Sequence, residues 1–240
     1  MTAMCGRYAT TKDAPDLSAL FEAFDDTRDG LVADYNVAPT DPVPVVRMSQ
    51  RLGGRTLSVA RWGLVPSWSG DTKGAARMIN ARAETVATTP AYARAFAGKR
   101  CLVPADGWYE WVRKPGGGKQ AYFMTAPEPV VFGGLWAAWG DQKLLTCSIV
   151  TMAALGDLAL VHNRMPLVLA PDRWAAWLAG GGDAGELLAP PSDATLAGIE
   201  IRPVGAAVGD VRNDGPDLVA RVAAPALAAP HEEPVELTLF

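Results

Sequence analysis

The sequence predicts a single α+β domain with a curved, mainly antiparallel β-sheet, a barrel-like core and helices at its periphery. Three observations support this fold class. Short apolar runs typical of strands recur along the chain, only a few segments have helical spacing, and turns rich in Pro and Gly separate them. The 240 residues are 49% hydrophobic, so a sizeable core can form, and no internal repeat is visible.

The first half of the chain is predicted to contain a helix followed by two strands. Asp13 and Pro15 are typical of a helix start. Apolar residues then recur at helical spacing, at Leu17, Leu20, Phe21 and Phe24. Prolines at positions 39, 42 and 44 indicate an extended segment leading into a strand near Val43–Met48, and Leu57–Leu64 has the composition of another strand.

The rest of the chain is predicted to be mostly strands. Thr89-Pro90 opens a short helix through Phe96 that Gly98 closes, and Asp172 caps a helix through Leu178 that ends in three glycines. Lys114–Gly118 is a predicted hairpin turn. The strand-like runs are Cys101–Val103, Trp108–Val112, Tyr122–Thr125, Val130–Trp136 and Leu144–Met152. Residues 5–222 form the predicted domain, and the alanine- and proline-rich residues 223–240 form a predicted flexible tail.

Composition limits the classes of function. No run of 18 apolar residues and no secretory signal is visible, and three cysteines without metal-ligand spacing suit a reducing, cytoplasmic compartment. Two histidines leave little scope for a zinc site, so neither a metal nor a cofactor is expected. The net charge is −4, but residues 47–115 carry 12 basic against 4 acidic side chains and several tryptophans. This segment is either a face that binds polyanions or a solvated basic surface.

Several polar residues stand in apolar or turn-rich surroundings where a core would not favour them. Asn80, Arg82 and Glu84 alternate, so an extended segment would place all three on one face. Glu110 lies between two tryptophans, and His162 and Arg164 precede an apolar run. Each has a plain structural alternative: an Arg82–Glu84 ion pair, a solvent-facing Glu110 on an edge strand, and a structural His162. At the N-terminus, removal of Met4 would make Cys5 the first residue, with an α-amine beside its thiol.

Six sequence blocks occur in a recognisable order between Cys5 and about Leu169. They are MCGRY, YNVAPT, RWGLVPSW, INARAET, CLVPADGWYEW and HNRMP. In these blocks the chain resembles the SRAP family, the SOS-response-associated peptidases, which includes proteins that crosslink to abasic sites in DNA. The resemblance implies a DNA-damage protein that binds single-stranded DNA and traps abasic sites, with possible lyase and autopeptidase activity, near the nucleoid and as a monomer.

The resemblance also implies roles for individual residues. The α-amine of Cys5 would attack the aldehyde of the opened abasic sugar, and its thiol would close a five-membered thiazolidine. An α-amine has an ordinary pKa of about 7.7–8, so part of it is neutral near pH 7. Glu110 would move protons, His162 would assist sugar-ring opening and the reverse reaction, and Asn80 would hold polar atoms of the site. The DNA-binding residues would be Arg7, Asn36, Pro39, Trp62, Trp68, Arg77, Arg82 and Arg164.

Two other functions stay open at this point. A thiol peptidase would use Cys5 as nucleophile, His162 as base and Glu110 to orient it, and would not need a free α-amine. A non-covalent reader of single-stranded or modified DNA would not need the thiol. For the crosslinking function, the residues ahead of Cys5 must be absent, either because translation starts at Met4 or because the leader is self-cleaved.

The segment Glu236–Phe240 is an apolar end on the predicted tail. One alternative is a terminal strand that folds back onto the domain. The other is binding to the replicative sliding clamp, because ELTLF resembles clamp-binding peptides of bacterial repair proteins, although Glu236 stands where those usually have glutamine.

Overall fold

The computed structural model describes residues 5–114, 116–224 and 227. Within this part of the chain, eleven strands belong to one sheet. Their bounds are β1 Tyr8–Thr10, β2 Phe24–Asp25, β3 Asp34–Val37, β4 Pro42–Ser49, β5 Gly54–Trp62, β6 Asn80–Arg82, β7 Arg100–Arg113, β8 Lys119–Trp139, β9 Leu144–Ala153, β10 Arg164–Pro166 and β11 Glu200–Val204. Among the described helices, none has the length and apolar character needed to cross a bilayer.

The strand order shows that the core is a barrel. The main path runs β11-β8-β9-β5-β4-β7-β1-β3, and β8 also pairs with β7 along most of the length of β7. Strands β8, β9, β5, β4 and β7 therefore form a closed circuit, which removes their free edges. Most pairings are antiparallel, and the parallel ones are β2 with β5, β5 with β9 and β6 with β9. The predicted α+β fold with a curved, mainly antiparallel sheet is confirmed.

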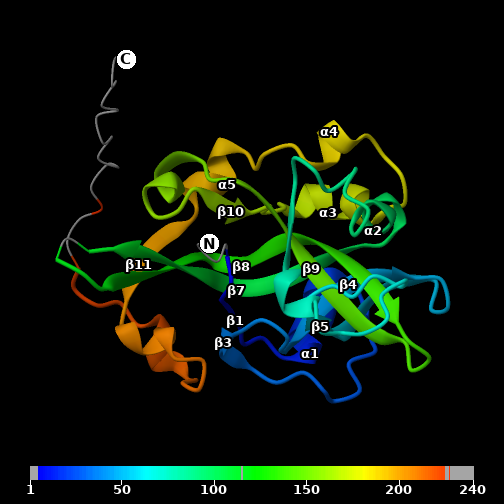
Figure 1. The fold of residues 1–240 in the computed structure, drawn as a ribbon, viewed down its shortest axis with the longest axis horizontal. Coiled ribbons are helices and arrows are strands. Elements are labelled where there is room, and N and C mark those ends of the chain that lie inside the picture. The colour runs from blue at the N-terminus through cyan, green and yellow to red at the C-terminus, as the bar shows by residue number, and fades with distance from the viewer. Residues whose placement is uncertain (1–4, 115, 225–226, 228–240) are drawn as a thin grey trace, which may run out of the picture.

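Helices lie around this barrel, as Figure 1 shows for α2, α3 and α4 along one side. The α-helices are α1 Ala14–Phe21, α2 Ala93–Gly98, α3 Pro171–Leu178, α4 Ala184–Leu187 and α5 Asp193–Ala197. The 3-10 helices are η1 Ala75–Arg77, η2 Gly156–Leu160, η3 Ala206–Gly209 and η4 Pro216–Val219. As predicted, Asp13 caps α1, its carboxylate accepting from Asp16 N–H. The predicted cap at Asp172 is wrong: Ala170 holds the N-cap position of α3, and Asp172 lies in the first turn.

Two predicted pairs of short strands are each one long strand. β7 joins Cys101–Val103 to Trp108–Val112 through a register shift between Ala105 and Gly107, a bulge where a Cβ on Gly107 would lie 2.3 Å from Met124 O. β8 likewise joins its two runs across Ala126–Pro129. The hairpin at Lys114–Gly118 is present, since Lys114 N–H donates to Gly118 O. Phe24, expected on the first helix, lies in β2 instead, because α1 ends at Phe21.

Aromatic side chains fill the core. Tyr8 contacts Trp62 and Phe132 edge-on, with ring centroids 5.0 and 6.0 Å apart, and Trp108 meets Phe132 at 5.9 Å. Such contacts contribute roughly 0.5–1.5 kcal/mol each beyond burial. The predicted tail at 223–240 lies outside the described residues except for Ala223, Ala224 and Leu227, and Glu236–Phe240 lies wholly outside them.

Candidate active site

Pairing between β1 and β7 brings Cys5 to Glu110. Tyr8 is opposite Trp108 in this antiparallel pair, and Tyr109 N–H donates to Arg7 O. Cys5 therefore reaches the face from which Glu110 projects, and its backbone N–H donates to Glu110 Oε1 at 2.8 Å. Both residues are only 3% exposed, which excludes the alternative of a solvent-facing Glu110. Cys5 has a φ of +31°, an unusual conformation for a residue other than glycine.

His162 stands beside this pair, just after η2. Its Nδ1 lies 3.9 Å from Glu110 Oε1. The same nitrogen lies 3.1 Å from Arg164 N and 3.3 Å from Arg164 O. A ring protonated only on Nε2 accepts from the Arg164 N–H, whereas a ring protonated on Nδ1 can donate to the carbonyl. Nδ1 of His162 therefore has a main-chain partner in either tautomer.

Asn80 completes the cluster from β6. Its side-chain Nδ2 donates to Cys5 O at 3.2 Å, and its main-chain carbonyl accepts from Tyr92 Oη at 3.0 Å. Pairing of β6 with β9 fixes this strand against the barrel. Tyr92 supports the site from the turn that precedes α2, a role that no local sequence pattern indicates. Cys5, Asn80, Glu110 and His162 are therefore close together in space.

Both the main chain and the side chain of Arg164 form hydrogen bonds. Its carbonyl accepts a long hydrogen bond from Cys5 Sγ at 3.8 Å. Its guanidinium donates to both Glu84 oxygens, at 2.5 and 3.0 Å, and to Thr151 O at 2.6 Å. In this structure the guanidinium of Arg164 is engaged by Glu84 and Thr151, and its expected contact with phosphate stays a prediction. Glu84 pairs with Arg164 and not with Arg82, since β6 ends at Arg82 and Glu84 lies in the turn beyond it.

Burial sets the protonation of the two central groups. It raises the pKa of the Glu110 carboxyl, an effect that His162 and the hydrogen bonds from Cys5 partly oppose. Burial also raises the pKa of the Cys5 thiol well above its ordinary value, and the nearby Glu110 carboxylate adds to that rise. The thiol is therefore protonated at neutral pH, and Glu110 can hold a proton at a higher pH than an exposed carboxyl.

Two of the expected DNA-binding residues are buried, and their contact with DNA stays a prediction. Trp62 is 0% exposed, and its Nε1 donates to Ile79 O inside the core, so no face of its ring is exposed for stacking in this structure. Asn36 is also buried, and its Nδ2 donates to Asp210 O and Asn213 O. Arg7 Nη1 donates to Asn36 Oδ1 and Val208 O, so this nitrogen ties β1 to η3. A contact between Arg7 and phosphate stays a prediction.

The other expected residues lie at the surface. Trp68 is 71% exposed, and Arg77 and Arg82 are exposed as well, while Pro39 is half-buried. Trp139 Nε1 donates to Ser69 O and so fixes the chain next to Trp68. The indole of Trp68 is available for stacking, and the two guanidiniums are available for anions.

A cavity of about 110 Å³ beside Trp68 contains basic residues that the sequence did not single out. Arg94, Lys99 and Trp136 line it together with Trp68, and none of its described lining residues is acidic. The Lys99 ammonium lies 5.1 Å from the centre of the Trp136 ring. Cations beside aromatic rings suit a strand of nucleic acid. Local sequence around Arg94 and Lys99 does not indicate that they line a cavity. The loop that carries Trp68 is brought to them by tertiary packing.

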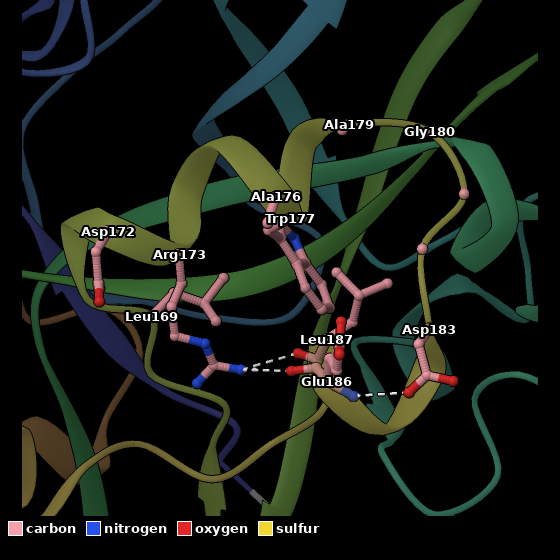
Figure 2. Close-up of a pocket in the computed structure, with 12 residues that line it drawn as sticks. Leu169, Asp172, Arg173, Ala176, Trp177, Ala179, Gly180, Asp183, Glu186 and Leu187 are labelled. Atoms are coloured by element: carbon pink, nitrogen blue, oxygen red, sulfur yellow. Dashed lines mark hydrogen bonds between the residues drawn. The ribbon is translucent and has the colours of Figure 1, made fainter.

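A second hollow, of about 340 Å³, lies between α3 and α4 (Figure 2). Its polar groups are used within the protein. Arg173 Nη2 donates to Leu187 O at 3.0 Å and to Glu186 O at 3.5 Å, and Glu186 N–H donates to the Asp183 carboxylate (Figure 2). Among the described residues there is no group of three His, Cys, Asp or Glu side chains placed to hold a metal ion.

Comparison with known proteins gives consistent matches. Residues 4–211 match the family described as SOS response associated peptidase (SRAP). The chain is 34% identical over 194 residues to abasic site processing protein YoaM of Bacillus subtilis, covering 73% of this chain and 79% of YoaM. It is 34% identical over 233 residues to abasic site processing protein YedK of Escherichia coli, covering 91% of this chain and 100% of YedK.

The fold has a solved counterpart as well. An X-ray structure of a protein from Bacteroides thetaiotaomicron aligns with a TM-score of 0.78 at 22% identity, covering 91% of this chain and 100% of that one. The match over residues 4–211 confirms the resemblance seen in the six sequence blocks. The chain therefore belongs to the SOS response associated peptidase (SRAP) family.

Proposed function

We propose that this protein processes abasic sites in DNA by forming a covalent bond through Cys5. The observation that carries the proposal is the 2.8 Å hydrogen bond from the Cys5 backbone nitrogen to Glu110 Oε1. When Cys5 is the first residue, that nitrogen is its α-amine, and a carboxyl group of raised pKa lies beside it. The relatives YoaM and YedK are named abasic site processing proteins, which supports the same substrate.

The reaction takes two steps. The neutral amine attacks the sugar aldehyde, and one amine proton passes to the aldehyde oxygen to give a carbinolamine. Glu110 then donates a proton to the departing hydroxyl, so that water leaves, a protonated imine forms and Glu110 becomes a carboxylate. The thiol sulfur adds to the carbon of the protonated imine, and the thiol proton passes to the Glu110 carboxylate, which restores the carboxylic acid. The product is a thiazolidine with a secondary amine. Because both nucleophilic atoms belong to one residue, the second step is intramolecular and strongly favoured.

His162 and Asn80 act around this pair. His162 can exchange a proton at Nδ1, so it assists opening of the sugar ring and the reverse reaction. Asn80 holds the Cys5 carbonyl and thereby fixes the direction of the amine. The mechanism requires that no residue precede Cys5, through a start at Met4 followed by methionine removal or through self-cleavage.

The thiol environment disfavours the peptidase alternative. A thiol peptidase needs a thiolate paired with imidazolium. Here the Cys5 Sγ–H is directed at Arg164 O, and burial raises the pKa of the thiol. Autopeptidase activity confined to the leader is compatible with the proposal, as is lyase activity during reversal.

Single-stranded DNA is the proposed partner of the surface near the site. Trp68 stacks on bases, while Arg77 and Arg82 bind phosphates, assisted by Arg94 and Lys99 beside Trp68. This recognition does not depend on base identity, because every base offers a stacking face and the cations contact the backbone. We propose a monomer acting in the cytoplasm near the nucleoid.

The test uses protein beginning at Cys5 and single-stranded DNA with one abasic site. We expect an adduct that survives denaturing electrophoresis, with none on intact DNA and none with Cys5→Ala. Cys147→Ala, which changes a buried cysteine of β9, is the matched control and should crosslink normally. A protein with one alanine ahead of Cys5 keeps the thiol but lacks the amine and should form no adduct. Crosslinking at the normal rate by that extended protein would contradict the role of the Cys5 amine.

A further inference from the structure

A groove of about 600 Å³ between η2, α5 and β11 takes no part in the proposed reaction. Its described lining residues include seven large aliphatic ones: Leu155, Leu158, Leu160, Leu196, Ile199, Ile201 and Leu227. Asp157 is the one charged residue among its described lining residues.

The chain after η4 runs along the edge of the sheet toward this groove. β11 stands at one end of the strand order. Arg221 forms an antiparallel bridge with Val204, and Val222 N–H donates to Pro203 O at 2.9 Å. An antiparallel course from Val204 leads back along β11 toward Ile201 and Ile199, which line the groove.

Leu227 confirms this direction. It lines the groove and packs, partly buried, against the adjoining core cluster. Arg221 also pairs with Glu200 of β11, so the start of the path is fixed by charge as well as by backbone hydrogen bonds. The chain thus reaches the groove at Leu227, the last residue that the structure describes.

The sequence that follows Leu227 matches the groove in character. Residues 228–240 contain Val235, Leu237, Leu239 and Phe240. In an extended segment Leu237 and Leu239 share a face. Thirteen extended residues reach at most about 43–47 Å, which is ample to cross a groove that begins where they begin.

We propose that residues 228–240 dock in this groove of the same chain and bury Leu237, Leu239 and Phe240 there. A tethered segment has an effective concentration in the millimolar range. An intrinsic affinity of only about 100 µM therefore keeps the segment docked roughly 90% of the time. Docking braces η2, and Leu158 of η2 also lines the hollow that holds Glu110 and His162. The segment consequently restrains the chain that carries His162.

Disulfide trapping in the full chain tests the docking directly. The pair Leu196→Cys with Leu239→Cys should form an intramolecular disulfide under mild oxidation, while the three native cysteines are buried and stay reduced. The pair Leu20→Cys with Leu239→Cys is the matched control, since Leu20 is a partly exposed leucine of α1 that does not line the groove. Absence of the first disulfide, or equal formation of both, would overturn the proposal.

Hydrogen exchange gives a second readout that needs no new cysteine. Replacing Leu237, Leu239 and Phe240 by serine in the full chain should speed exchange of residues 155–160 and 196–201 up to about tenfold, as the docked fraction predicts. The control Leu20→Ser should leave both segments unchanged. Unaltered exchange in the triple variant would contradict the proposal. Protection that grows with protein concentration would assign the groove to a second copy instead and would overturn docking within one chain.

Discussion

The backbone nitrogen of Cys5 and the carboxylate of Glu110 are joined by a 2.8 Å hydrogen bond between residues 105 positions apart. Pairing of β1 with β7 creates this contact, and both residues are almost fully buried. Burial raises the pKa of Glu110, so the carboxyl group beside the Cys5 nitrogen holds its proton more tightly than in water. An acid placed at this nitrogen can both deliver and remove the protons that imine formation requires.

Glu110→Gln should slow adduct formation by about 10²–10⁴-fold, the usual contribution of general acid–base catalysis. Glutamine keeps an oxygen that can accept from the Cys5 nitrogen but cannot carry the proton. The measurement is the rate of crosslinking in single-turnover gels. A rate within a few-fold of wild type would show that Glu110 does not transfer the proton.

His162→Ala should act mainly on the reverse direction. It should slow release of DNA from a purified adduct more than it slows adduct formation, because His162 lies 3.9 Å from Glu110 and does not contact the Cys5 nitrogen in this structure. Both rates are measured on the same preparation. Equal effects of the two variants on both steps would remove this division of roles.

The pH dependence of stability should carry the signature of Glu110. A carboxyl group whose folded pKa is raised above the unfolded value of about 4.3 stabilises the fold below that value and loses this contribution as pH rises through the folded pKa. Glu110→Gln should therefore melt at a higher temperature than wild type at pH 7–8. The difference should vanish as pH falls toward 4. A constant difference across this range would show that Glu110 is not destabilised by burial.

Glu84→Gln should loosen Arg164 and through it both His162 and Cys5. The Arg164 bond lowers the pKa of Glu84, so this pair stabilises the fold above the unfolded carboxyl pKa and stops doing so as pH falls through the folded one. Glu84 is half-exposed, so we expect a loss of about 1 kcal/mol or less at pH 7. Crosslinking should slow as well, whereas the exposed control Glu128→Gln should change neither quantity. Unaltered crosslinking in Glu84→Gln would limit the pair to a structural role.

Salt dependence should report the phosphate contacts. If about three to five phosphates are neutralised, log affinity for single strands should fall against log salt with a slope of roughly −2 to −3.5. Arg77→Ala or Arg82→Ala should each flatten the slope by about one contact. Arg28→Ala is the control and should leave the slope unchanged. Trp68→Ala should weaken binding by about 1–3 kcal/mol with an unchanged slope, because it removes stacking and no charge. Affinity independent of salt would contradict an electrostatic interface.

The same contacts show what could be predicted from the sequence and what could not. Polar residues in apolar surroundings drew attention to Asn80, Glu110 and His162, and these do lie together. Apolar periodicity gave most strands, but it could not show that a bulge at Gly107 makes two predicted strands into one. Such a bulge depends on the partner strand, which local pattern does not reveal.

The burial of individual tryptophans and the partners of charged side chains were the features that could not be predicted from the sequence. A tryptophan in a basic segment suits both a core and a stacking surface, so Trp62 and Trp68 were alike in the sequence although one is buried and the other exposed. Glu84 lies two residues from Arg82 yet binds Arg164, which is 80 residues away. Partner choice among charges is set by the folded arrangement, and spacing along the chain does not determine it.

The most direct test of the central claim is mass spectrometry of the adduct after digestion of protein and DNA. We predict that the sugar remnant is attached to the N-terminal peptide at Cys5 and that the attachment has consumed both the amine and the thiol. Iodoacetamide should then fail to alkylate Cys5, and the adduct should persist without borohydride reduction. An adduct on another residue, or on Cys5 with a thiol that still reacts, would contradict the thiazolidine mechanism.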